Sequence, residues 1–239
     1  MPKNALADLP EVFVSHAAIK TAVSRAVAKG TLRQIGSKLY TSNLIDAPEA
    51  IVRRHLWPLV AAYVPGALIV DRTAIESRPA ADGSIFVIAD RKRDIDLPGV
   101  TIRSRKGAGP LETDRPFVGG LFLSSTARAW LDNMVPSRRR NGGVSRTMSR
   151  EELEDRLDDV VRRSGVKALN SIRDEARRIA PLLDRAKEND AFDRMVGALH
   201  GTRKTGLTTD RAKARGSRKP YDPDRLKLFE LLHGELRAT

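Results

Sequence analysis

Apolar residues recur at helical spacing in the segment from Ser15 to Gly30. A repeat at i, i+3/i+4 and i+7/i+8 predicts an amphipathic helix with one face packed on the protein. Ser15 is a good N-cap, Lys29 falls in the last turn, and Gly30 suits the residue that ends a helix. The apolar stripe consists of Ala18, Ile19, Ala22, Val23, Ala26 and Val27, and the opposite face carries Lys20, Thr21, Ser24, Arg25 and Ala28.

Two short alternating segments come after this helix, residues 32–35 and 38–41, on either side of Gly36-Ser37. Alternation of apolar and polar residues around a glycine turn predicts a β-hairpin. The hairpin carries two cations, Arg33 and Lys38, and one aromatic residue, Tyr40.

The apolar pattern of residues 48–64 predicts a second helix, with Asp46 as its cap and Pro48 in its first turn. We expect Pro58 to kink this helix, and we expect His55 on its inner stripe to be a packed side chain and not a ligand. Short strands are predicted at 68–70, 85–89, 100–103 and 120–123, followed by a helix that Ser124 and Ser125 would cap. Strands that alternate with short helices indicate a small mixed α/β module over residues 46–136.

The last third of the chain is predicted to be helical. Residues 137–150 hold five arginines, a Gly-Gly pair and no acid, which is typical of a linker or flexible loop. Ser149 and Glu152 then form a capping box that opens a helical domain over residues 149–200, with Leu153, Leu157, Val160 and Val161 on its first apolar face. A basic linker over 201–220 precedes a terminal helix over 221–239, whose stripe we expect to bind a partner: Leu226, Phe229, Leu232 and Leu236.

Charge narrows the choice of partner. The 239 residues carry a formal charge of +13 and a pI near 10.5, which favours nucleic acid, an anionic membrane or an acidic protein. The sequence has no cysteine, so it excludes a disulfide scaffold, and no apolar run reaches the ~18–20 residues that span a bilayer. We therefore expect a cytoplasmic protein without a membrane partner.

The first 45 residues are predicted to be a winged helix-turn-helix. A helix with a slim, cationic outer face fits a major groove, and a basic hairpin beside it can lie along the phosphates. The alternative is an ordinary amphipathic helix with a solvated hairpin. In the DNA-binding interpretation Lys20, Thr21, Ser24 and Arg25 face the groove, Lys29, Arg33 and Lys38 hold the backbone, and Tyr40 braces the wing.

The stretch VSRAVAKGTLRQIGSKLYTSN resembles the N-terminal winged helix of AbiEi-type antitoxins of type IV toxin–antitoxin systems, and residues 67–134 resemble the next region of the antitoxins in that family. The resemblance implies a repressor that binds inverted repeats in the double-stranded DNA of its own operon and counteracts a partner toxin. One departure is the helix before the motif, for which only Asn4 to Leu9 are present. The fold class expected overall is α+β: a winged helix, an α/β module and a helical C-terminal domain.

The C-terminal stretch KPYDPDRLKLFELLHGELRA resembles the region that precedes the catalytic domain in Fic-family proteins with an AbiEi-like front end. The Fic loop HPFxxGNGR does not occur in these 239 residues, so AMP transfer is not assigned to them. The resemblance leaves open a second function, a regulatory and interaction module for a Fic-domain protein.

A nucleotidyltransferase is the third and weakest hypothesis. Gly83-Ser84 followed by Asp94 and Asp96 matches the Gly-Ser and paired-acid pattern of those enzymes, whose acids hold Mg²⁺. Here Gly83-Ser84 leads into a strand-like segment, and Pro98 stops the strand that should present the acids. With four scattered histidines, no cysteine and no phosphate-binding glycine motif, we expect no catalytic site, no metal and no cofactor.

Overall fold

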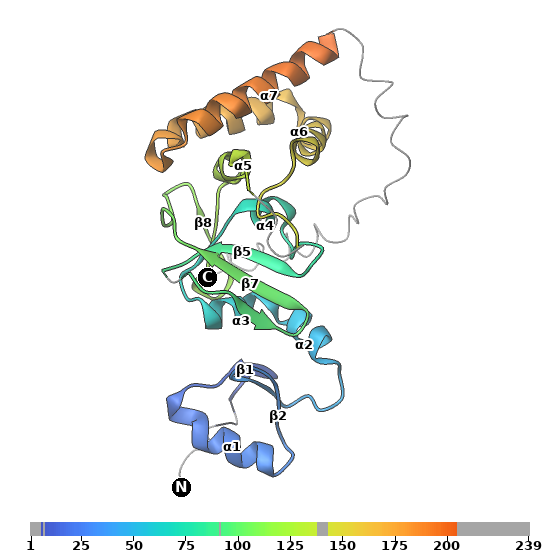
Figure 1. Cartoon of the computed structure of the whole chain (residues 1–239), viewed down its shortest axis with the longest axis vertical. Helices are drawn as coiled ribbons and strands as arrows, with labels where there is room; N and C mark the ends of the chain where they lie inside the picture. Colours follow the sequence, from blue (N-terminus) through green and yellow to red (C-terminus); the bar gives the residue numbers. More distant parts are fainter. Residues whose placement is uncertain (1–5, 7, 91, 138–142, 205–239) are drawn as a thin grey trace, which may run out of the picture. The chain divides into compact units, whose positions relative to one another are not determined.

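The computed structural model describes residues 6, 8–90, 92–137 and 143–204 (Figure 1). The chain is mixed α/β, with one three-stranded and one six-stranded sheet. The described residues up to Val196 form one compact unit.

The N-terminal module, residues 12–45, is a helix packed on the three-stranded sheet. Strand β3 lies in the middle of the sheet, antiparallel to both neighbours. Its elements are β1 (Val12–Val14), the 3₁₀ turn η1 (Ala17–Ile19), α1 (Lys20–Ala28), β2 (Arg33–Gly36) and β3 (Leu39–Thr41). Their shared core consists of Phe13, Ile19, Val23, Ala26 and Leu32.

Two local predictions for this module were wrong, and one strand was missed. Ser15 does not cap the helix: its backbone N–H donates to the Lys38 carbonyl at 2.7 Å, and the helix begins later through the η1 turn. The hairpin turn is Ser37-Lys38 instead of Gly36-Ser37. Strand β1 was not predicted, because three residues give too little alternation to recognise. Of the predicted helix at 4–9, residues 4, 5 and 7 lie outside the described residues, and Leu6 and Asp8 are in turns.

The predicted helix over 48–64 is two helices, α2 (Pro48–Arg54) and α3 (Leu56–Tyr63). The break lies at His55 because the ring of Pro58 conflicts with the carbonyl four residues earlier, on Arg54. Ala47 and not Asp46 is the N-cap residue. The Asp46 carboxylate instead accepts from Arg54 at 2.5 Å.

The six-stranded sheet has the order β6-β7-β5-β4-β9-β8. The β4–β9 and β5–β7 pairs are parallel and the other pairs antiparallel, so the sheet is a mixed one. Figure 1 shows β5 and β7 between α4 (Asp71–Glu76) on one side and α3 on the other. The strands are β4 (Leu68–Ile69), β5 (Ser84–Ile88), β6 (Ile95–Leu97), β7 (Val100–Arg105), β8 (Arg115–Pro116) and β9 (Phe122–Leu123), with the 3₁₀ turn η2 (Val118–Gly120) before β9.

The C-terminal helices begin at caps that the sequence predicted. Ser125 caps α5 (Thr126–Met134) by accepting from the Arg128 N–H, and Ser149 with Glu152 forms the capping box of α6 (Arg150–Ile179). Gly165 interrupts α6 with a φ of 78°, which an L-residue with a side chain rarely adopts. The 3₁₀ turn η3 (Pro181–Leu183) and α7 (Ala186–Lys204) follow, so the first four residues of the predicted linker at 201 are helical.

Residues 143–149 are not a flexible loop, contrary to prediction. The Arg146 carbonyl accepts from the Arg72 N–H, and the Arg146 guanidinium lies 2.9 Å from an oxygen of Asp71. Asp71 is fully buried and also receives two hydrogen bonds from Arg105 at 2.9 and 3.0 Å. The described part of the arginine-rich segment therefore packs against the α/β module, while residues 138–142 lie outside the described residues.

Glu152 provides a test of how α6 is attached. Its carboxylate takes two hydrogen bonds of 2.9 Å from Arg72, and these lower the Glu152 pKa from the ordinary 4.5 to about 2. A depressed carboxyl pKa contributes stability that is present above pH 4.5 and is lost as the pH falls through about 2. We expect Glu152→Gln to lower the free energy of unfolding at neutral pH and to flatten its decline in this acid range.

Urea unfolding at several pH values measures this effect. The matched control on the same helix is Glu154→Gln, because Glu154 pairs with an exposed arginine, Arg150, and such pairs contribute little. Equal pH profiles for the two variants would contradict the assigned role of Glu152.

Candidate nucleic-acid interface

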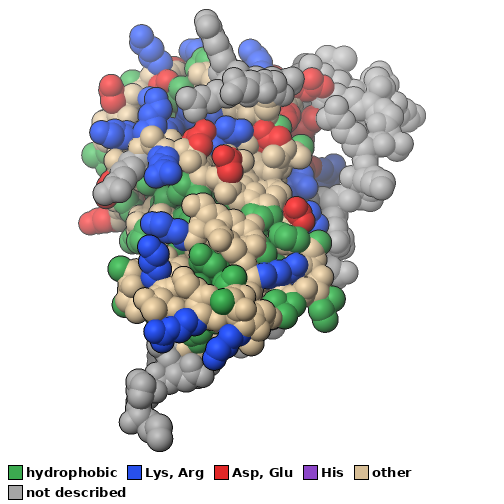
Figure 2. All heavy atoms as spheres, turned by 60° about the horizontal axis from the view of Figure 1, so that its bottom comes forward, with side chains coloured by type: hydrophobic (Ala, Val, Ile, Leu, Met, Phe, Trp, Pro, Cys, Tyr) green, Lys and Arg blue, Asp and Glu red, His purple; other side chains and the backbone are tan. Residues whose placement is uncertain are grey.

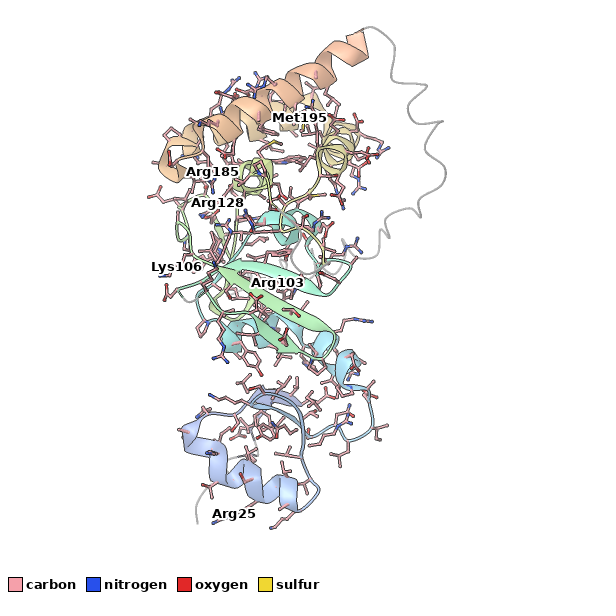
Figure 3. All side chains as sticks on the ribbon, in the orientation of Figure 1. Arg25, Arg103, Lys106, Arg128, Arg185 and Met195 are labelled. Atoms are coloured by element: carbon pink, nitrogen blue, oxygen red, sulfur yellow. The ribbon has the colours of Figure 1, made fainter. Side chains whose placement is uncertain are left out.

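One face of α1 is buried and the other is open to solvent. Val23 and Ala26 pack into the module's core, where Val23 is 1% exposed. The side chains predicted for the major groove all lie on the exposed face: Lys20, Thr21, Ser24 and Arg25. Figure 3 shows Arg25 on the outer side of α1, pointing away from the protein.

The charge of the module is of one sign. Residues 12–45 contain five Lys or Arg residues and no Asp or Glu. In Figure 2, where the end that carries α1 is turned forward, Lys and Arg side chains are spread over this end, and most acidic side chains lie over other elements. Nothing within the segment therefore neutralises the cations of α1, and a polyanion would meet an unopposed positive potential.

The guanidinium of Arg33 forms hydrogen bonds within the protein. Its Nε donates to the Asn43 carbonyl at 2.9 Å, and its Nη2 donates to the Asp46 carbonyl. These bonds hold the loop after β3, so they occupy donors that the DNA interpretation had assigned to phosphate. Sequence patterns do not distinguish this use of an arginine from a solvent-facing one.

The wing is fixed by contacts at its turn. The Ser37 carbonyl accepts from the Tyr63 hydroxyl on α3 at 2.6 Å, and burial raises the pKa of Tyr63 to about 12. Lys38 occupies the left-handed region with a φ of 57°, yet its side chain is exposed. Its ammonium is free to approach a phosphate beside the module, as is that of Lys29, which comes directly after α1 and is also exposed.

Tyr40 lies against the sheet, as a bracing residue should. Its ring stacks on Phe13 of the neighbouring strand, with centroids 6.2 Å apart and an interplanar angle of 25°. Tyr40 is also packed against the core of the module. Tyr40 therefore packs strand β3 against the module's core.

A polar cluster at the opposite end of the sheet joins the module to α2. Glu11 accepts from Asn43 at 2.7 Å and lies 2.8 Å from Nε2 of His55. The hydrogen bond from Asn43, with that from His55, lowers the pKa of Glu11. Sequence reasoning did not identify Glu11 or Tyr63, because each acts through a partner more than 20 positions away. His55 lies at the break between α2 and α3 and not on the inner stripe of a single helix as predicted, and its partly buried ring lies against a carboxylate.

The residues of the nucleotidyltransferase pattern have structural partners. Ser84 begins strand β5 instead of a helix, and its hydroxyl accepts from Arg103 at 2.7 Å. Gly83 has a φ of 80°, and a Cβ there would lie 2.4 Å from the Gly99 carbonyl oxygen. Asp94 lies 3.3 Å from Arg103, and Asp96 accepts from Thr101. A tight turn, an ion pair and two hydrogen bonds therefore involve the residues of this motif.

Metal sites and membrane spans can be judged for the described part of the chain. Within it, no three His, Cys, Asp or Glu residues are grouped so as to hold a metal ion. No helix among the described residues is both long enough and apolar enough to cross a membrane. The predicted partner-binding stripe of Leu226, Phe229, Leu232 and Leu236 lies outside the described residues.

No protein-family model, curated protein or solved structure matches this chain.

Arg33 can be tested as a loop-holding residue. We expect Arg33→Ala to cost about 1–3 kcal/mol in the free energy of unfolding, because two carbonyls lose their donor. Arg33→Lys should cost nearly as much, since an ammonium cannot span both carbonyls as a guanidinium does. Urea denaturation of the two variants measures this, and a Lys variant as stable as the wild type would show that only the charge matters.

Proposed function

We propose that the chain is a sequence-specific DNA-binding transcriptional regulator that contacts double-stranded DNA through α1. The observation that carries the proposal is the exposed face of α1, cationic and slim, on a helix whose other face is held in a core. A helix anchored in this way presents its side chains in a fixed arrangement, which direct readout of base edges requires.

The arrangement of the module supplies the recognition helix and the wing of the proposed winged helix-turn-helix; within residues 12–45 the helix before α1 is the short 3₁₀ turn η1. A hairpin comes directly after α1, and β1 closes the sheet on the far side of β3. In this proposal Lys20 and Arg25 take guanine edges, and Thr21 and Ser24 allow close approach to bases or phosphates. Lys29 and Lys38 hold the backbone on either side, and Tyr40 supports the wing. Arg33 is reassigned from phosphate to the loop after β3.

The biological role we propose is that of an AbiEi-like antitoxin. Its support is the resemblance of residues 23–43 to the winged helix of that family, together with the α/β module after it. The protein would repress its own toxin–antitoxin operon from the cytoplasm and bind or regulate a partner toxin. A Fic-domain protein remains the alternative partner, and it rests on the terminal stripe that lies outside the described residues.

The test of the proposal is selection of duplexes from a random-sequence pool by the purified chain, followed by fluorescence anisotropy with the selected duplex. Binding that prefers the selected duplex over scrambled DNA, and that weakens as salt rises, is the expected result. Failure to enrich any sequence would contradict sequence-specific recognition.

Arg25 is expected to read a base. Arg25→Ala should weaken binding to the selected duplex by ~1–3 kcal/mol and relax the preference at one base pair, because a bidentate contact is lost. The matched control is Lys167→Ala, which removes an exposed cation from the helical region. Anisotropy titrations against duplexes with single substitutions measure both effects, and an unchanged base preference would overturn the assignment of Arg25.

Lys38 is expected to hold a phosphate. Lys38→Asn removes the charge and keeps a residue that tolerates the left-handed backbone. Binding should weaken by a similar factor for all sequences, and the slope of log K against log salt should fall by about one. A slope equal to that of the wild type would place Lys38 away from the DNA.

A further inference from the structure

Two adjacent aliphatic side chains stand in solvent at the end of the N-terminal module. Ile45 is 93% exposed and Leu44 is 48% exposed. They belong to the loop after β3, residues 42–47, which we call the aliphatic loop. A single exposed aliphatic residue is ordinary, but two neighbours on one loop expose apolar area that folding would otherwise remove from water.

Hydrogen bonds fix the backbone conformation of the aliphatic loop. The side-chain oxygen of Asn43 accepts from the N–H groups of Ile45 and Asp46 at 3.0 and 2.9 Å. Its amide nitrogen donates to Glu11 and to the Asp46 carboxylate, at 2.7 and 3.0 Å. Arg33 holds the carbonyls of Asn43 and Asp46 from the other side. The backbone on both sides of Leu44 and Ile45 is thus fixed, and a surface ordered in advance loses little conformational entropy on binding.

The sheet places the aliphatic loop at the C-terminal end of α1. Strand β3 runs away from the Ser37-Lys38 turn, so the loop after it lies at the opposite end, beside the start of β2. The start of β2 is joined to α1 by a short turn, in which the N–H groups of Thr31 and Leu32 donate to the Ala26 carbonyl. The two ends of α1 are therefore flanked by different structures: the wing turn at one end and the aliphatic loop at the other.

The charges around the aliphatic loop indicate which kind of molecule would bind to it. The loop ends the acid-free segment 12–45, and the nearby acids Glu11 and Asp46 each lie against Arg54, at 3.4 and 2.5 Å. Arg53, in the last turn of α2, is exposed. A second copy of the chain, with a formal charge of +13, would bring like charges together, whereas a duplex brings opposite ones. Leu and Ile are among the residues that proteins insert between base steps in a minor groove.

We propose that Leu44 and Ile45 form an apolar wedge that enters the minor groove of the DNA duplex bound by α1 and bends it. The proposal rests on the DNA-binding function proposed above and adds a second, apolar contact to it. Insertion of an aliphatic side chain unstacks a base step and opens an angle in the duplex, so flexible pyrimidine–purine steps are the expected targets.

The test compares Leu44→Ser/Ile45→Ser with the wild type on the duplex that the wild type selects. A matched control is Val166→Ser/Leu182→Ser, which removes two exposed aliphatic side chains, 40% and 65% exposed, from the helical region. Binding is measured by fluorescence anisotropy across a salt series. Bending is measured by energy transfer between dyes at the two ends of the duplex.

We expect the wedge variant to bind roughly tenfold more weakly, to lose the bend, and to keep the wild-type salt slope, because an apolar contact releases no counterions. The control should match the wild type in all three. Unchanged affinity and bending in the wedge variant would overturn the proposal, as would a wild-type duplex that is straight. A wild type that forms dimers in light scattering and a wedge variant that does not would also overturn it, in favour of an interface between copies. Absence of DNA binding by the wild type would instead be the failure of the proposed function.

Discussion

The packing of α1 on its three-stranded sheet is the contact that determines which side chains of the N-terminal module are left for a partner. Phe13, Val23 and Ala26 close that contact, and the cluster they share with Ile19 and Leu32 is the module's core. Because only one face of α1 is used, the opposite face is left with cations and small polar residues in water. The residues of α1 that do not pack in the core are the ones available to a partner.

The second constraint is that the module is held at both ends of its sheet. At one end of the sheet the Tyr63 hydroxyl donates a hydrogen bond to the Ser37 carbonyl. At the other end, the polar cluster around Glu11 contacts His55 at the end of α2. These contacts leave α1 on the side of the sheet away from α3, as Figure 1 shows. These contacts orient the cations of α1 relative to the α/β module. In the proposed function, such an orientation would favour recognition of one DNA site geometry.

The sequence predicted those features that local rules determine. Helical periodicity located α1, and side-chain caps located the starts of α5 and α6, since Ser125, Ser149 and Glu152 act within one turn. Alternation located β4, β5, β7 and β9 only to within a few residues, and it did not predict β6 or β8. Strand β1 was missed because its three residues give too little alternation to recognise, and its partner β3, 25 or more residues away, adds no local signal.

The roles of individual arginines were the hardest to predict. Arg25 lies in solvent as predicted, whereas Arg33 holds the loop after β3 and Arg146, predicted to lie in a linker or flexible loop, pairs with a buried aspartate. An arginine side chain is long enough to reach partners far apart in sequence, so its partner depends on tertiary structure.

Whether α1 is the helix that contacts DNA is measured most directly by backbone amide NMR of the chain during titration with a selected duplex. We expect the largest shift changes on Lys20–Lys29 and on the flanking turns, and changes confined to the α/β module or the C-terminal helices would contradict a DNA-contacting α1.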